Sequence, residues 1–96
     1  MTPRVEWKTF DQLEASLRAL QQLYTDSHDS RSELRKAVIR AKDRARFAAR
    51  NPEVAPEKRA EKEEMVRWML VWLENPLIFT DWIVLRRARL QDPAIL

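Results

Sequence analysis

Glycine and cysteine are both absent from this chain of 96 residues. An average chain of this length contains roughly seven glycines, which supply the left-handed backbone of tight hairpins and bulges. Their absence argues against a β-rich fold, and it leaves no glycine-rich loop to cradle a phosphate. Because there is no cysteine, the chain can form no disulfide, thiolate metal site or cysteine nucleophile. This composition fits a reducing compartment, and we expect a cytoplasmic protein.

The chain has a single histidine, His28, in a polar stretch between Asp26 and Asp29. Neighbouring polar residues on a loop do not form a preorganised triad, because a triad is defined by its geometry. Without a second histidine or a cysteine, a zinc site is disfavoured. The sequence therefore predicts no catalytic, metal or cofactor site. An enzyme is kept as a third hypothesis, which requires Asp26, His28 and Asp29 to meet in a cleft.

Long uninterrupted apolar runs are missing too. The most apolar stretch, residues 65–85, contains three charged residues: Arg67, Glu74 and Asp81. A charged residue at the centre of a membrane costs about 2.5–3.5 kcal/mol on insertion scales, so we predict no transmembrane helix. No apolar run follows a basic start within residues 1–10, and we therefore expect no signal peptide.

The apolar residues that are present recur at helical spacing in four segments, of which the first covers residues 9–25. It opens with the capping box Thr9-x-x-Gln12, a pattern that marks a helix N-terminus. Its apolar residues follow three and four positions apart: Phe10, Leu13, Leu17, Leu20 and Tyr24. This spacing predicts an amphipathic helix with a narrow apolar stripe.

The second predicted helix covers residues 31–50. A second capping box, Ser30-x-x-Glu33, precedes it, and Asn51-Pro52 ends it because the residue before proline is pushed out of the helical region. Its expected inward stripe consists mostly of small residues, namely Leu34, Val38, Ala41, Ala45 and Ala48. Small side chains let a neighbouring backbone approach, so this helix is expected to pack closely against another.

The third and fourth helices are expected at residues 56–74 and 76–91. Pro56 suits the first turn of the third helix, and Asn75 is expected to cap the N-terminus of the fourth. The first half of the third helix is almost wholly charged and its second half is apolar except for Arg67, so only the second half is expected to reach a core. Apolar side chains fall on three sides of the fourth helix, which predicts burial all round.

These patterns predict an all-α fold in which residues 1–96 form a single domain of about four helices, arranged as a small helical bundle. Two features of this bundle point to function. One is the charge of the second helix, and the other is the tryptophan content of the C-terminal helical hairpin.

The second helix is strongly basic. Residues 31–50 contain eight basic and two acidic residues, a local charge of +6, whereas the whole chain carries +3 and the remaining residues sum to −3. The expected outward face is a continuous cationic strip with Ile39 and Phe47 among the charges. Its candidate contacts to a partner or to phosphates are Arg35, Lys36, Arg40, Lys42, Arg44, Arg46 and Arg50. In the alternative interpretation, these basic residues are only good helix formers on a solvated face, and some of them pair with the acidic start of the third helix.

The C-terminal hairpin holds three of the four tryptophans. The first two helices offer one apolar stripe each, which is too little to cover a fourth helix that is apolar on three sides. We therefore expect the hairpin to be shared in a homo-oligomer, most simply a two-fold dimer. The candidate interface residues are Trp68, Met69, Trp72, Leu73, Phe79, Trp82 and Ile83.

The sequence thus leaves two binding hypotheses. The leading one is a small non-enzymatic protein-interaction adaptor or regulator, which self-associates through its hairpin and presents the basic helix to a protein partner. The alternative is a nucleic-acid-binding accessory protein that uses residues 31–50 to contact the phosphate backbone.

Overall fold

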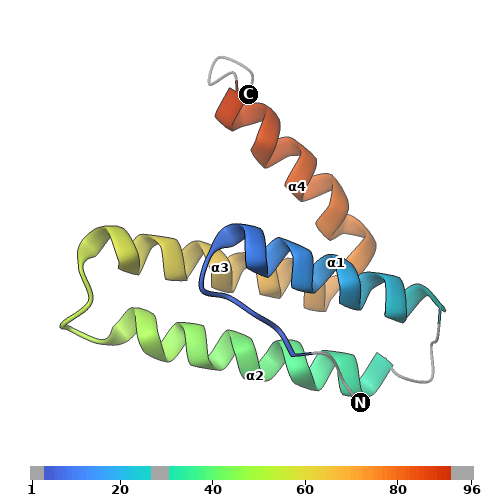
Figure 1. Ribbon diagram of the computed structural model, residues 1–96, viewed down its shortest axis with the longest axis horizontal. Coiled ribbons are helices and arrows are strands. Elements are labelled where there is room, and N and C mark those ends of the chain that lie inside the picture. The colour runs from blue at the N-terminus through green and yellow to red at the C-terminus, as the bar shows by residue number, and fades with distance from the viewer. Residues whose placement is uncertain (1–3, 27–30, 92–96) are drawn as a thin grey trace.

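The computed structural model describes residues 4–26 and 31–91. These residues form no strand and four helices: α1 (Phe10–Asp26), α2 (Arg31–Arg50), α3 (Pro56–Glu74) and α4 (Pro76–Gln91). α1, α2 and α3 lie side by side with nearly aligned axes, whereas α4 leaves the end of α3 at a steep angle (Figure 1). The extended residues before α1 cross toward α2. This is the small all-α bundle that the sequence predicts.

The helix ends follow from local hydrogen bonds. Thr9 Oγ1 accepts a bond of 3.1 Å from the backbone N–H of Gln12, and Gln12 Oε1 accepts one of 3.2 Å from the N–H of Lys8. Asn75 separates α3 from α4: its N–H bonds to the Val71 carbonyl, while its Oδ1 accepts from the N–H of Leu77 at 3.0 Å. A single residue therefore ends one helix and caps the next, which gives the sharp corner between α3 and α4.

The inward stripe of α2 differs from the predicted one at its last position. Ala49 is 5% exposed and belongs to the core side, whereas Ala48 is only partly buried. The expected stripe assumed a repeat of 3.5 residues per turn, but a straight α-helix has 3.6 and drifts by about 20° per heptad. After two heptads the drift is about 40°, which leaves Ala48 at one edge of the buried stripe and Ala49 at the other. As expected for a stripe of small residues, α2 packs extensively along α3.

The core is built around the second half of α3. All the buried residues of α3 lie in that half, as predicted, and Trp68, Met69 and Trp72 are at most 2% exposed. The indole N–H of Trp72 donates a hydrogen bond of 3.1 Å to the carbonyl of Leu17 on α1. The ring of Trp68 contacts Phe79 on α4, with 6.0 Å between the ring centroids.

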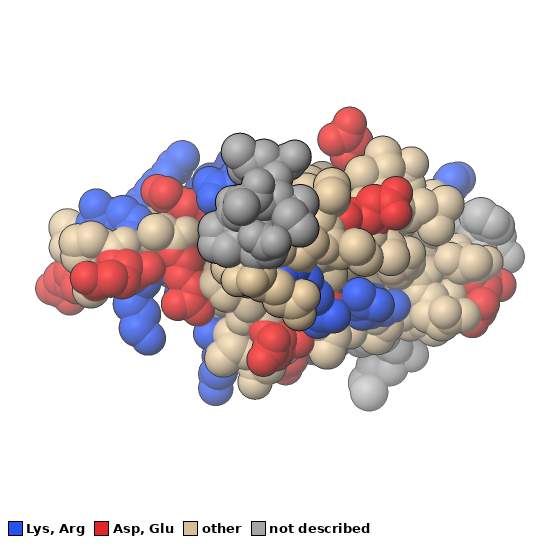
Figure 2. All heavy atoms as spheres, turned by 90° about the horizontal axis from the view of Figure 1, so that it is seen from above, with Lys and Arg blue, Asp and Glu red and all other residues tan. Residues whose placement is uncertain are grey.

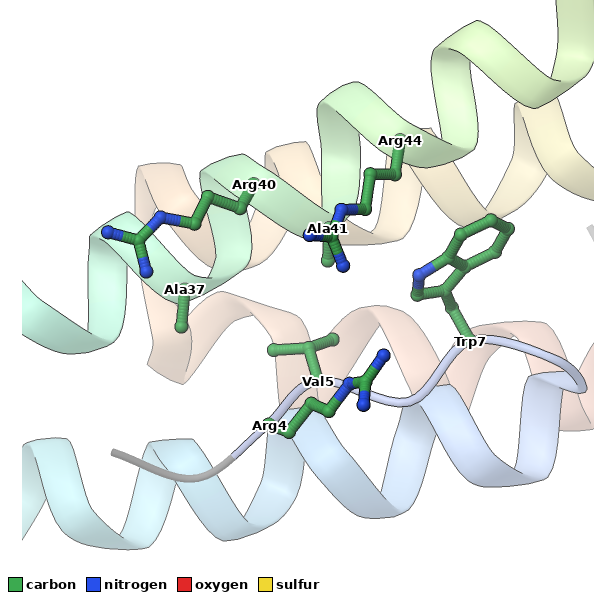
Figure 3. Close-up of a pocket in the computed structure, with 7 residues that line it drawn as sticks. All are labelled: Arg4, Val5, Trp7, Ala37, Arg40, Ala41 and Arg44. Carbon is green, nitrogen blue, oxygen red and sulfur yellow. The ribbon is translucent and has the colours of Figure 1, made fainter. Parts of the chain in front are cut away.

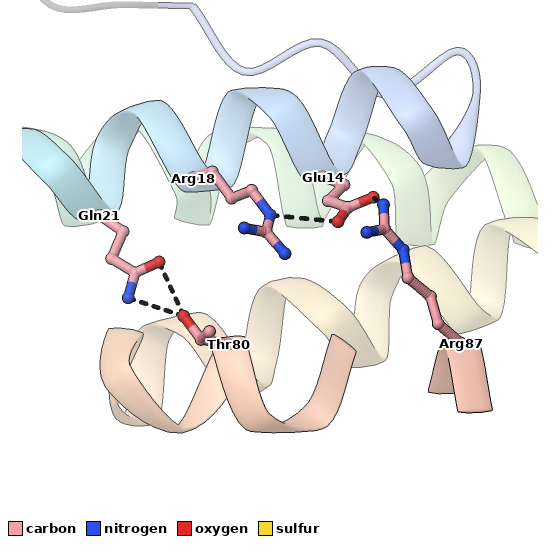
Figure 4. Close-up of polar contacts among 5 residues, drawn as sticks. All are labelled: Glu14, Arg18, Gln21, Thr80 and Arg87. Atoms are coloured by element: carbon pink, nitrogen blue, oxygen red, sulfur yellow. Dashed lines mark hydrogen bonds and ion pairs between the residues drawn. The ribbon is translucent and has the colours of Figure 1, made fainter. Parts of the chain in front are cut away.

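A polar contact also holds α4 against α1 (Figure 4). Glu14 is 7% exposed, and its two carboxylate oxygens accept hydrogen bonds from Arg18 on the same helix and from Arg87 on α4. Further along, Gln21 and Thr80 exchange hydrogen bonds of 2.9 and 3.1 Å. A buried carboxylate is costly unless it is paired, so the position of Arg87 is tied to that of α1.

Charged side chains are unevenly distributed over the surface. Seen from above, they gather at the end where α3 begins, whereas uncharged residues predominate toward the end where α4 leaves α3 (Figure 2). None of the helices formed by residues 4–26 and 31–91 has the length and apolar character that crossing a bilayer requires.

We predict that Glu14→Gln lowers the free energy of unfolding by about 1.5 kcal/mol, the low end of the range for hydrogen bonds to charged groups. The low end applies because the Arg18 and Arg87 side chains are 45% and 59% exposed. Glu33→Gln is the matched control, since that carboxylate is exposed and its pair with Lys36 contributes about 0.5 kcal/mol at most. Urea unfolding measures the free energy of unfolding of both variants, and an equal decrease in the two would contradict the role of Glu14.

Candidate anion-binding groove

The basic residues of α2 occupy the side of the helix opposite its buried stripe. At about 100° per residue, their positions run without a wide gap from Lys42 and Arg35 at one edge of this side to Arg40 and Arg44 at the other. Several are already engaged within the chain. Arg35 donates to the carbonyl of Leu73, Lys36 pairs with Glu33 at 3.3 Å, and Lys42 pairs with Asp43 at 3.5 Å.

Arg40 and Arg44 instead line a groove between α2 and the N-terminal segment (Figure 3). The groove has a volume of about 230 Å³. Arg4 enters it from the opposite wall, with its guanidinium toward that of Arg44, and Arg40 extends along α2 (Figure 3). The rest of the lining is apolar or aromatic: Val5, Trp7, Ala37 and Ala41.

The N-terminal wall is held in place by contacts to α1 and α3. Val5 is 6% exposed and belongs to the hydrophobic core. The backbone N–H of Glu6 donates to Ser16 Oγ at 3.0 Å, and Lys62 Nζ lies 4.8 Å from the centroid of the Trp7 ring. Because the residues that follow Arg4 are anchored, its backbone is fixed at the edge of the groove.

The electrostatics of the groove favour an anion. No acidic residue lines it, and within residues 4–26 and 31–91 no carboxylate pairs with Arg4, Arg40 or Arg44. Arg40 and Arg44 are four residues apart on one helix, a spacing at which like charges destabilise the helix. Three arginines thus line one hollow without an acidic partner, which favours the binding of a negative group.

A second hollow of about 220 Å³ adjoins the first and shares Arg4, Val5, Trp7 and Arg44 with it. Its additional lining residues are Glu6, Lys8 and Lys62. The two hollows together form what we call the arginine groove, in which five basic side chains surround one acidic side chain: Arg4, Lys8, Arg40, Arg44 and Lys62 around Glu6.

Arg4, Trp7 and Lys62 were missed as site residues in the sequence, because Arg4 precedes the first periodic segment and Lys62 looks like one charge among many. The signal that could have pointed to them is the pair Val5 and Trp7. Two apolar residues before a helix cap are expected to pack back onto the fold, as in a hydrophobic staple, and so to bring Arg4 with them.

Arg46 and Arg50 lie apart from the groove. They border a separate hollow of about 210 Å³, whose lining includes Glu63 of α3. Phe47, between them in sequence, is 81% exposed. The basic side of α2 thus contributes Arg40 and Arg44 to the arginine groove, while Arg46 and Arg50 border a second hollow close to the exposed Phe47.

The seven residues expected at an oligomer interface are placed differently from the prediction. Trp82 is partly buried against the core of the single chain. The other six are at most 8% exposed, namely Trp68, Met69, Trp72, Leu73, Phe79 and Ile83. The prediction underestimated the cover that the chain itself supplies. Val5 and Trp7 join the core from the N-terminal segment, and the guanidinium of Arg86 lies 5.0 Å from the centroid of the Trp68 ring.

The polar stretch considered for catalysis falls mainly on residues 27–30. His28 and Asp29 therefore lie outside the described residues, as does the predicted cap Ser30, while Asp26 is the last residue of α1. Among the residues that the structure describes, no group of three or more histidine, aspartate or glutamate side chains is placed to hold a metal ion.

The repulsion within the groove predicts that Arg44→Gln stabilises the unliganded fold. Removing one like-charged pair at this spacing is worth about 0.2–0.5 kcal/mol, or roughly 1–4 °C in the melting temperature of a domain this size. We expect the melting temperature of Arg44→Gln to exceed that of the wild type at low ionic strength. The difference is expected to vanish at about 1 M salt, where the screening length is about 3 Å. Thermal melts in both buffers measure it, and a destabilised variant at low salt would show that Arg44 has a favourable partner.

Comparison with models of known protein families, with curated proteins and with solved structures finds no match to this chain.

Proposed function

We propose that this protein is a non-enzymatic binding module that captures an acidic segment of a protein partner in the arginine groove. The observation that carries the proposal is that Arg4, Arg40 and Arg44 line the same hollow, which no acidic residue lines. Arginine binds carboxylates through a planar fork of donors, and it is enriched at the centres of protein interfaces.

The dimensions and lining of the groove favour a peptide over a small molecule. Pockets for drug-sized ligands and cofactors measure about 300–1,000 Å³, whereas each of the two hollows here is below that range. A hollow of this size accommodates one side chain. Val5, Ala37 and Ala41 offer an apolar surface to the stem of that side chain, and the arginines offer charge-assisted hydrogen bonds to its carboxylate.

A direct test uses a short fluorescein-labelled peptide rich in glutamate and leucine, with the same peptide carrying glutamine for glutamate as its control. We expect Arg44→Glu to weaken binding of the glutamate peptide about tenfold or more, because each 1.4 kcal/mol is a factor of ten and charge-assisted bonds contribute about 1.5–3 kcal/mol. Fluorescence anisotropy gives the dissociation constants.

Arg67→Glu is the matched control for that substitution. It makes the same change in net charge on an exposed position of α3 that lines neither hollow. If the two variants lost affinity for the glutamate peptide equally, the effect would come from the overall charge of the protein and not from the groove. Equal affinity of the protein for the two peptides would contradict carboxylate recognition.

Nucleic-acid binding is a second candidate, favoured by the 81% exposure of Phe47 next to Arg46 and Arg50. Stacking of a base on an exposed aromatic ring is worth about 1–3 kcal/mol. If this surface binds single-stranded DNA, the logarithm of the affinity falls linearly with the logarithm of the salt concentration, and Phe47→Ala weakens binding at every salt concentration. Anisotropy with labelled single-stranded DNA tests this, and absence of binding at low salt would exclude the candidate.

A further inference from the structure

The outward side of α4 is an apolar surface that the chain itself leaves uncovered. Phe79 and Ile83 face the core and are at most 1% exposed. At about 100° per residue, the opposite side of the helix carries Asp81 at its centre with Leu77, Val84 and Ala88 along one flank, and Ile78 and Leu85 along the other. Four of these side chains are large and at least half exposed: Leu77, Ile78, Val84 and Leu85. This set, with Ala88, is the outer face of α4.

The position of α4 makes its outer face accessible. α4 leaves the layer formed by α1, α2 and α3 at a steep angle (Figure 1), and the exposed fractions of its outer side chains show that the other three helices leave them uncovered. Burial of a large aliphatic side chain is worth about 1.5–3 kcal/mol, and a group of exposed apolar side chains around a single charge is typical of an interaction site.

The charges along α4 indicate which partner fits. Asp81 lies in the first half and is the single acidic residue of the helix, whereas the second half contains Arg86, Arg87 and Arg89. Arg86 and Arg87 pair with Glu64 and Glu14. Asp81 and Arg89 are both exposed, and neither has an ion pair with any residue that the structure describes.

A second copy of α4 in antiparallel orientation complements this pattern. The half that carries Asp81 then lies beside the half that carries the partner's Arg89, and the two-fold axis repeats the contact. The antiparallel arrangement also places opposite ends of the two helix dipoles together, whereas a parallel pair brings like ends and like charges side by side.

We propose that the outer face of α4 is a homodimer interface in which the two α4 helices pair antiparallel. The dimer is weak. α4 has 16 residues and is about 24 Å long, so a single helix pair of this length buries less than the about 1,200–2,000 Å² of a standard stable interface. It dissociates on dilution, and it presents two arginine grooves to a partner.

Charge reversal combined with sedimentation velocity tests this arrangement. The wild-type protein is measured from low micromolar to near-millimolar concentration, together with Asp81→Arg, Arg89→Asp and the double variant. Each single substitution replaces an attractive contact by a repulsive one and is expected to weaken the dimer about tenfold or more, while the double variant returns to within a few-fold of the wild type. All three changes are at exposed positions, and circular dichroism confirms that the variants fold.

An apolar substitution provides a second measurement. Val84→Ser is expected to weaken the dimer, and Phe47→Ser, which removes a more exposed apolar side chain from α2, is expected to leave it unchanged. A wild-type protein that stays monomeric at every concentration, or that forms a larger oligomer, overturns the proposal. So does a double variant that is as weak as the single ones, because that result excludes the antiparallel orientation.

Discussion

The burial of two tryptophans on α3 is the constraint on which the rest of this fold depends. Trp68 and Trp72 are each at most 2% exposed, and one helix neighbour cannot cover both. α2 packs along one side of α3, while α1 accepts the indole hydrogen bond of Trp72 at the Leu17 carbonyl. α4 turns back sharply at Asn75 so that Phe79 reaches Trp68. The small residues of α2 and the steep angle of α4 both serve this packing.

The same packing creates the arginine groove. Because the core needs further apolar cover beside α1 and α2, Val5 is drawn in from the N-terminal segment, and the residue before it is left at the rim. Arg4 thereby meets Arg40 and Arg44, residues more than thirty positions away in the sequence. Burial of one valine thus places Arg4 on the same hollow as Arg40 and Arg44, and the absence of a carboxylate among the residues that line this first hollow leaves the three arginines available to a partner.

Sequence patterns were sufficient for the helices. The capping residues Thr9 and Asn75 and the change of character midway through α3 all predict features that the structure has. Sequence patterns were insufficient to predict the surfaces, because the exposure of a side chain depends on contacts between residues that are distant in the sequence. The apolar count of α4 did not reveal which side Trp68 would cover, and the charge of α2 did not reveal that Arg35 reaches the carbonyl of Leu73. Arg4 lies outside any periodic segment, so no pattern linked it to α2.

Nuclear magnetic resonance would test the role of the arginine groove most directly, with the side-chain Nε–H signals of the arginines and the indole signal of Trp7 followed during titration with the glutamate-rich peptide. We predict that the signals of Arg4, Arg40, Arg44 and Trp7 shift together along one binding curve, while that of Arg67 stays in place. Shifts confined to Arg46 and Arg50, or uniform small shifts of every arginine, would contradict binding in the groove.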